Sequence, residues 1–90
     1  MIQKIQQEEL RVMKFIWEKN DEVISKEVIE FMENKYNCKH YTTFPLLSKL
    51  VKKEFLSAEK IGKYTYYKIV VGKREYLNFK IENFIGKRKV

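Results

Sequence analysis

The chain has 90 residues, of which 44% are hydrophobic and 34% charged, so it can bury one modest core but not two separate ones. Its 19 Lys and Arg residues outnumber its 12 Asp and Glu residues, and the formal charge of +7 favours a polyanionic partner. Nucleic acid is the first expectation and an anionic membrane surface the second. No apolar run approaches the roughly 20 residues of a membrane span, and the polar N-terminus does not resemble a signal peptide. We therefore expect a cytoplasmic protein.

Two amphipathic helices are expected in the first third of the chain. The first covers residues 7–19, and its apolar residues recur at helical spacing at Leu10, Met13, Ile16 and Trp17. Residues 22–24 are β-prone enough for a minimal strand. The second helix then runs to about Tyr36, and we expect the Ser25 hydroxyl to cap its N-terminus.

A third helix is expected over residues 42–54, with an apolar face and a basic face. The apolar face consists of Leu46, Leu47, Leu50 and Val51. If Thr42 caps this helix, Pro45 falls in the first turn, where backbone N–H groups have no intrahelical partner in any case. The first residues would then point outward together at the positive end of the helix dipole, a position that suits phosphate or a groove edge. The alternative is a core helix whose lysines only keep it soluble.

After residue 54 the hydrophobic pattern changes to a period of two. Residues 55–60 and 64–71 predict two strands joined by a short glycine-bearing turn over Ile61, Gly62 and Lys63. Helical spacing returns in a last helix, which we expect Gly86 to end before a basic tail. The apolar stripe of this helix would either dock on the same chain or pair with a second copy, through Tyr76, Leu77, Ile81, Phe84 and Ile85.

This order of elements predicts an α+β fold, a small winged helix-turn-helix domain with three helices, a two-stranded hairpin wing and a C-terminal helix. We assign residues 1–71 to the DNA-binding domain, and residues 72–90 to a C-terminal helix and basic tail that form a candidate dimerisation element. In this architecture the third helix lies in the major groove and the hairpin, residues 55–71, reaches the adjacent backbone. The candidate DNA-binding residues are Thr42, Thr43, Phe44, Pro45, Ser48, Lys49, Lys52, Lys53, Lys60, Lys63 and Tyr64.

Several single residues allow two interpretations. Phe44 would either contact a thymine methyl group or fold back under its helix. Cys38 has no second cysteine in the chain and only His40 nearby, so a reduced loop thiol is expected in place of a disulfide or a closed zinc site. The chain has no arrangement of residues that indicates catalysis, a cofactor or a metal, and we do not expect an enzyme.

Four segments resemble the BlaI, MecI and CopY family of bacterial transcriptional repressors. They are VMKFIW at residues 12–17, LSKLVKKEFL at residues 47–56, KYTYYKI at residues 63–69 and NFI at residues 83–85. The resemblance implies a homodimeric repressor that binds a palindromic operator in double-stranded DNA and is released by a signal. It places Lys49 at the basic position of the recognition helix, which is usually arginine in the family.

The start of the third helix departs from that family. Phe44 and Pro45 stand where the family commonly has an Arg-Thr or similar pair, and TTFPLLSKL is similar to a segment of PadR-type regulators. Two alternatives therefore stay open beside the repressor. One is a PadR-like, ligand-responsive regulator, and the other is a winged-helix protein-interaction module without sequence-specific DNA binding.

Overall fold

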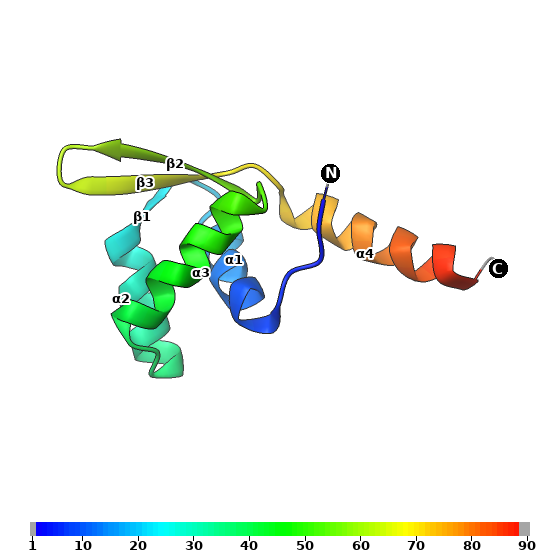
Figure 1. Ribbon diagram of the computed structural model, residues 1–90, viewed down its shortest axis with the longest axis horizontal. Coiled ribbons are helices and arrows are strands. Elements are labelled where there is room, and N and C mark those ends of the chain that lie inside the picture. The colour runs from blue at the N-terminus through cyan, green and yellow to red at the C-terminus, as the bar shows by residue number, and fades with distance from the viewer. Residues whose placement is uncertain (1, 89–90) are drawn as a thin grey trace.

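Residues 2–88 form four helices and three short strands, in the order that the sequence predicts. The computed structural model describes residues 2–88, and side chains as far as residue 82. The elements are α1 (Gln7–Lys19), β1 (Val23–Ile24), α2 (Ser25–Tyr36), α3 (His40–Lys52), β2 (Leu56–Ile61), β3 (Tyr64–Ile69) and α4 (Lys73–Arg88). Figure 1 shows α1, α2 and α3 packed below the β2–β3 hairpin, while α4 leads away from them. The expected α+β class is confirmed.

The first two helices begin in the same way, with a glutamate that turns back to the preceding backbone. Glu9 Oε1 accepts a hydrogen bond of 2.8 Å from the N–H of Gln6, and Glu27 Oε1 accepts one of 3.0 Å from the N–H of Ile24. The hydrogen bond from Ile24 lowers the pKa of Glu27. Ile24 is thus the N-cap of α2 and Ser25 is its first helical residue. The expectation that Ser25 caps this helix was wrong, because Glu27 supplies the capping oxygen.

The third helix begins earlier than expected. It starts at His40, since the N–H groups of Thr42 and Thr43 already donate to the Lys39 carbonyl at 2.9 and 3.2 Å. Pro45 therefore lies inside the helix and removes one backbone hydrogen bond from it. The predicted Thr42 cap and first-turn proline were both wrong. Tertiary packing of the buried leucines compensates for a proline that local propensity disfavours.

The chain leaves α3 at Lys52 and enters the hairpin through a left-handed residue, Glu54, which has a φ of 64°. The sheet is antiparallel in the order β1-β3-β2. Ile61 pairs with Tyr64, so the connecting turn has two residues rather than the three expected. Gly62 has a φ of +63° there, a conformation that glycine adopts without strain. The tip of the hairpin projects past the three helices (Figure 1).

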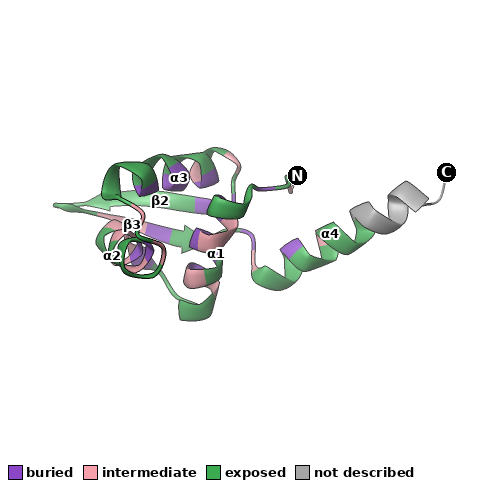
Figure 2. Ribbon diagram, turned by 90° about the horizontal axis from the view of Figure 1, so that it is seen from below, coloured by how far each residue is buried: buried purple, intermediate pink, exposed green. Residues whose placement is uncertain are grey.

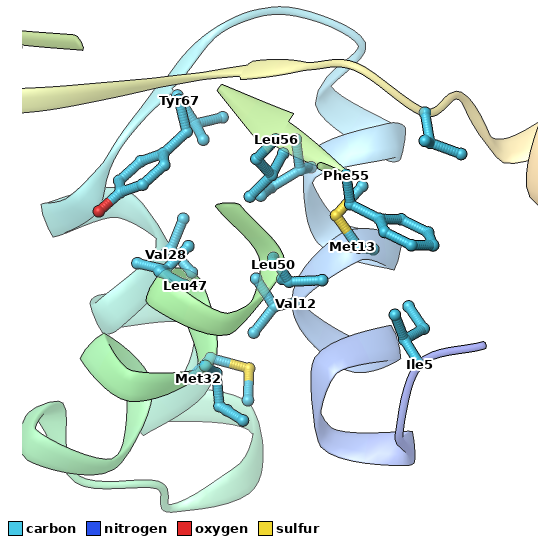
Figure 3. Packing of buried hydrophobic residues seen from close by; sticks show 14 of the residues in the cluster. Ile5, Val12, Met13, Val28, Met32, Leu47, Leu50, Phe55, Leu56 and Tyr67 are labelled. Atoms are coloured by element: carbon cyan, nitrogen blue, oxygen red, sulfur yellow. The ribbon is translucent and has the colours of Figure 1, made fainter. Parts of the chain in front are cut away.

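One hydrophobic core joins the three helices to the base of the hairpin. In Figure 3, Leu47 of α3 lies beside Val28 of α2, and Leu50 lies beside Val12 of α1. Tyr67 covers these helices from β3, and burial raises the pKa of its hydroxyl. The core therefore holds α3 by one face only. The residues buried in this core are Ile5, Val12, Met13, Ile16, Val23, Val28, Met32, Leu46, Leu47, Leu50, Phe55, Leu56, Tyr67, Val71 and Tyr76.

The first turn of α4 is anchored to this core by Tyr76. The buried Tyr76 ring lies 5.4 Å from the Phe55 ring and 6.0 Å from the Trp17 ring, and its hydroxyl accepts a hydrogen bond of 3.2 Å from the N–H of Ile5. Trp17 is half-buried and donates from Nε1 to the Val71 carbonyl at 2.9 Å. Tyr76 thus follows the expected alternative of docking on the same chain.

Beyond this turn α4 extends away from the body (Figure 2). Leu77 and Ile81 in this part of the helix are exposed. The helix continues through Gly86 to Arg88, so the expected stop at Gly86 was wrong. A glycine inside a helix costs only about 1 kcal/mol relative to alanine, which does not by itself end a helix. The side chains of Phe84 and Ile85, and those of the basic tail, lie outside the described residues. No helix of residues 2–88 is long and apolar enough to cross a membrane.

Candidate nucleic-acid interface

The face of α3 that points away from the core is exposed along its whole length. This outer face is defined by Tyr41, Thr42, Phe44, Pro45, Ser48, Lys49 and Lys52, all of which are exposed. Six of these seven were predicted from the sequence as candidate binding residues. Lys49 and Lys52 follow each other at a spacing of three residues, so their ammonium groups project from the same side of the helix. The outer face thus combines a mixed apolar and hydroxyl half with a basic half.

Thr43 is not part of this face. Its exposed fraction is 0%, and its hydroxyl lies 3.9 Å from the sulfur of the half-buried Cys38. The prediction that Thr43 points outward was wrong. A helix that begins at His40 places Thr43 one turn before Leu46 and Leu47, on the side that packs.

Two aromatic side chains of the outer face are largely open to solvent. Phe44 is 45% exposed, so the alternative in which it folds back under the helix was wrong. Tyr41 is 65% exposed, and its ring lies 5.7 Å from the His40 ring in an edge-to-face arrangement. Tyr41 was not among the residues predicted from the sequence, because the helix was expected to begin one residue after it. Its spacing of three residues before Phe44 is the signal that an earlier start would have used.

Lys53, the residue directly after α3, differs from Lys49 and Lys52 because this chain supplies it with a counterion. Its Nζ lies 2.9 Å from Glu9 Oε1, and the side chain of Lys53 is only 25% exposed. The Glu9 side chain is 1% exposed, and its other oxygen, Oε2, has no hydrogen-bonding partner among the described residues. The ion pair links the N-terminus of α1 to the end of α3. The candidate Lys53 is therefore already engaged within the domain.

The hairpin carries the remaining candidates. Lys60, Lys63 and Tyr64 are all exposed around the turn, and Ile61 beside them is also exposed. Further down β3, Lys68 lies 3.8 Å from Glu22, a solvent-exposed pair. The lysines at the tip thus carry positive charge out to the part of the hairpin that extends beyond the helices (Figure 1).

The profile of the penicillinase repressor family matches residues 5–88. The chain belongs to the penicillinase repressor family. A solved structure described as the DNA binding domain of the repressor BlaI, determined in solution, superposes with a TM-score of 0.74 at 29% sequence identity. The match covers 84% of this chain and 94% of that chain. No curated protein matches the chain.

Membership of the penicillinase repressor family confirms the resemblance to the BlaI, MecI and CopY repressors and the winged-helix fold. In this fold α2 and α3 form the helix-turn-helix, and the β2–β3 hairpin forms the wing. The outer face of α3 is therefore the exposed side of the second helix of the helix-turn-helix. The family match extends through α4 as well.

Proposed function

We propose that this protein is a sequence-specific DNA-binding transcriptional repressor that acts in the cytoplasm as a homodimer. In this proposal α3 enters the major groove and the wing contacts the adjacent backbone. The observation that carries it is the outer face of α3, which the core leaves free along the whole helix. A DNA partner also accounts for the formal charge of +7, because lysines and arginines that neutralise backbone phosphates release counterions and so favour binding.

The lysines of the outer face are available for such a partner. Among residues 2–82, neither Lys49 nor Lys52 lies within 4.0 Å of a carboxylate, whereas Lys53 does. Lys49 lies at the start of the last turn of α3, and we assign it to base edges, because a lysine can donate to guanine O6 or N7. Lys52 is nearer the end of the helix, where we assign it to phosphate. Ser48 lies between the two halves of the outer face, and its hydroxyl can donate to a base edge or to a phosphate.

The wing supplies contacts that position the domain without reading sequence. Lys63 lies in the turn, Lys60 is near the end of β2 and Tyr64 begins β3, and all three side chains are exposed. Because the tip of the wing extends beyond the helices, we expect its ammonium groups to contact phosphates outside the groove that α3 occupies. Each such contact releases a counterion, so affinity should fall steeply with salt concentration.

We assign dimerisation to α4. Leu77 and Ile81 are exposed at a spacing of four residues and so share one side of the helix. Phe84 and Ile85 continue that spacing in the sequence. A two-fold axis through α4 would relate two α3 helices, and the operator would then be an inverted repeat with half-sites about one helical turn apart.

Oligomeric state tests this assignment directly. The variant with both Leu77→Ser and Ile81→Ser should shift the mass measured by light scattering from that of a dimer to that of a monomer. Asn78→Ser changes an exposed neighbour on the same helix and should leave the dimer intact. A parent protein that is monomeric at all concentrations, even on its operator, would remove dimerisation from the proposal.

Selection of randomised duplex DNA against the purified protein, followed by titration of the enriched duplex at several salt concentrations, tests the function. An enriched inverted repeat supports the dimeric repressor. Recovery of no motif, with weak and wholly salt-driven binding, would favour the protein-interaction module. A motif whose binding is abolished by a small molecule would favour the ligand-responsive alternative.

Three single variants separate base contacts from backbone contacts. Lys63→Ala should weaken binding to all duplexes similarly and reduce the salt slope by about 1. Lys49→Ala should change the ranking of duplex sequences as well. Lys14→Ala, an exposed lysine of α1 outside the proposed interface, is the matched control and should change neither. An unchanged salt slope for Lys63→Ala would remove Lys63 from the interface.

A further inference from the structure

The chemistry of the outer face restricts which base edges it can read. From Tyr41 to Lys52 its exposed side chains are tyrosine, threonine, phenylalanine, proline, serine and two lysines. None of them is the asparagine or glutamine that pairs bidentately with adenine, or the arginine that pairs bidentately with guanine. Hydrogen-bonded recognition through this face is therefore limited to the hydroxyl groups and the lysines.

The N-terminal half of the outer face is instead an apolar surface. Tyr41 and Phe44 are 65% and 45% exposed, and Pro45 is exposed beside them. Residues three and four apart are neighbours on a helix, so the three side chains form one continuous patch. The edge-to-face contact of 5.7 Å between the His40 and Tyr41 rings supports the Tyr41 ring from the helix start. Large apolar side chains left in water on a helix that otherwise packs well indicate a partner with apolar groups.

In the major groove the only apolar group that varies with sequence is the C5-methyl group of thymine. We propose that Tyr41, Phe44 and Pro45 read the methyl groups of consecutive thymines, so that each half-site of the operator contains a short thymine run. This inference rests on the proposed function and specifies its DNA target. Lysines on the same helix and on the wing supply the charge that holds this patch against DNA and not against an apolar protein surface.

The dimensions of the patch set the length of the run. Tyr41 and Pro45 are four residues apart, which is about 6 Å along a helix axis. Successive bases of one strand are about 3.4 Å apart, so the patch spans about two base steps and faces two or three thymines. Burial of one methyl group changes affinity by about fourfold.

The experiment uses the duplex enriched by selection and replaces its thymines one at a time with deoxyuridine, which removes only the C5-methyl group. We expect an affinity loss of about fourfold at each of two or three neighbouring positions per half-site, and none at thymines elsewhere. Phe44→Ala should bind the thymine and deoxyuridine duplexes with equal affinity at the positions that Phe44 covers. Phe44 and Tyr41 are both exposed, so their substitution should not unfold the protein, and circular dichroism checks that the variants stay folded.

Tyr41→Phe is the matched control for the tyrosine, because it keeps the ring and removes only the hydroxyl. It should keep the preference for thymine over deoxyuridine, whereas Tyr41→Ala should lose it. Sequence-specific binding that deoxyuridine does not weaken, or an enriched site without thymine, would overturn the methyl inference and leave the repressor proposal standing. Failure to bind any duplex specifically would overturn both.

Discussion

The two faces of α3 both carry large apolar side chains, but among residues 2–82 only the inner face is covered by other parts of the chain. On the inner face Leu47 and Leu50 are fully buried against α1 and α2, while on the outer face Tyr41 and Phe44 are open to solvent. Hydrophobicity alone therefore does not distinguish core from binding surface in this helix. The two faces differ in whether other helices cover them. Substitutions on the inner face should therefore change the free energy of unfolding, and substitutions on the outer face should change DNA affinity.

Loss of an inner-face leucine is the largest change that we expect. Leu50→Ala should lower the free energy of unfolding by about 2–5 kcal/mol, because it removes buried methyl groups and leaves a cavity. Urea unfolding followed by circular dichroism measures this difference. The neighbouring Lys49→Ala should leave the unfolding midpoint unchanged and alter only DNA binding. Equal destabilisation by both variants would contradict the assignment of the two faces.

The Glu9–Lys53 ion pair joins the first turn of α1 to the end of α3, and substitution of its two residues should have unequal effects on stability. Lys53→Met leaves the Glu9 carboxylate buried without its cation and should cost about 3 kcal/mol. Glu9→Gln leaves a lysine that can turn toward water, so its cost should be about 1 kcal/mol, mainly from the weakened cap of α1. A double-mutant cycle in urea unfolding measures both values. Similar costs for the two single variants would show that the pair is solvated.

Tyr67 extends the inner surface onto the sheet and should make stability sensitive to alkaline pH. Burial raises its pKa above the ordinary 10.0, so the unfolded chain loses this proton at lower pH than the folded protein does. The stabilisation is complete below pH 10.0 and is lost as the pH rises from there through the folded pKa. Tyr67→Phe should flatten the fall in unfolding free energy between about pH 9 and about pH 11. Parallel pH profiles would contradict burial of the hydroxyl.

The smallest effect is expected from Thr43→Val. Thr43 is fully buried, and its hydroxyl makes only a long contact to the Cys38 sulfur. Valine has the same shape, so neither the equilibrium constant of unfolding nor the DNA affinity should change by more than about twofold. Thr42→Val, one position earlier on the outer face, should alter DNA affinity without altering stability. Titration of the selected duplex compares the two. A larger loss of affinity from Thr43→Val would mean that the helix is rotated on DNA.

Hydrophobic spacing was enough to predict the order of the elements and the packed face of α3. Leu46, Leu47 and Leu50 all lie in the core as expected, since a core-facing stripe follows from helical periodicity alone. The start of α3 was not predictable in the same way. A hydroxyl at Thr42 and a proline at Pro45 both indicate a later start, and the earlier one depends on tertiary packing that local signals do not contain.

Part of the candidate interface was also beyond local reasoning. The spacing of α3 predicted the exposure of Lys49 and Lys52, but it could not show that Lys53 has a counterion 44 residues away. Glu9 lies three and four residues before the buried Val12 and Met13, on the packed side of α1, but the sequence does not show which cation pairs with it. Contacts between distant segments decide which charges remain free for a partner.

The hydrogen bond from Ile5 to Tyr76 joins residues that are 71 positions apart. A contact of that span closes the chain almost from end to end, and the conformational entropy of such a loop must be lost before the contact forms. The contacts among α1, α2, α3 and the hairpin close shorter loops of chain. We therefore expect the helix-turn-helix and wing to form first during folding, and the N-terminal segment and α4 to dock onto them last.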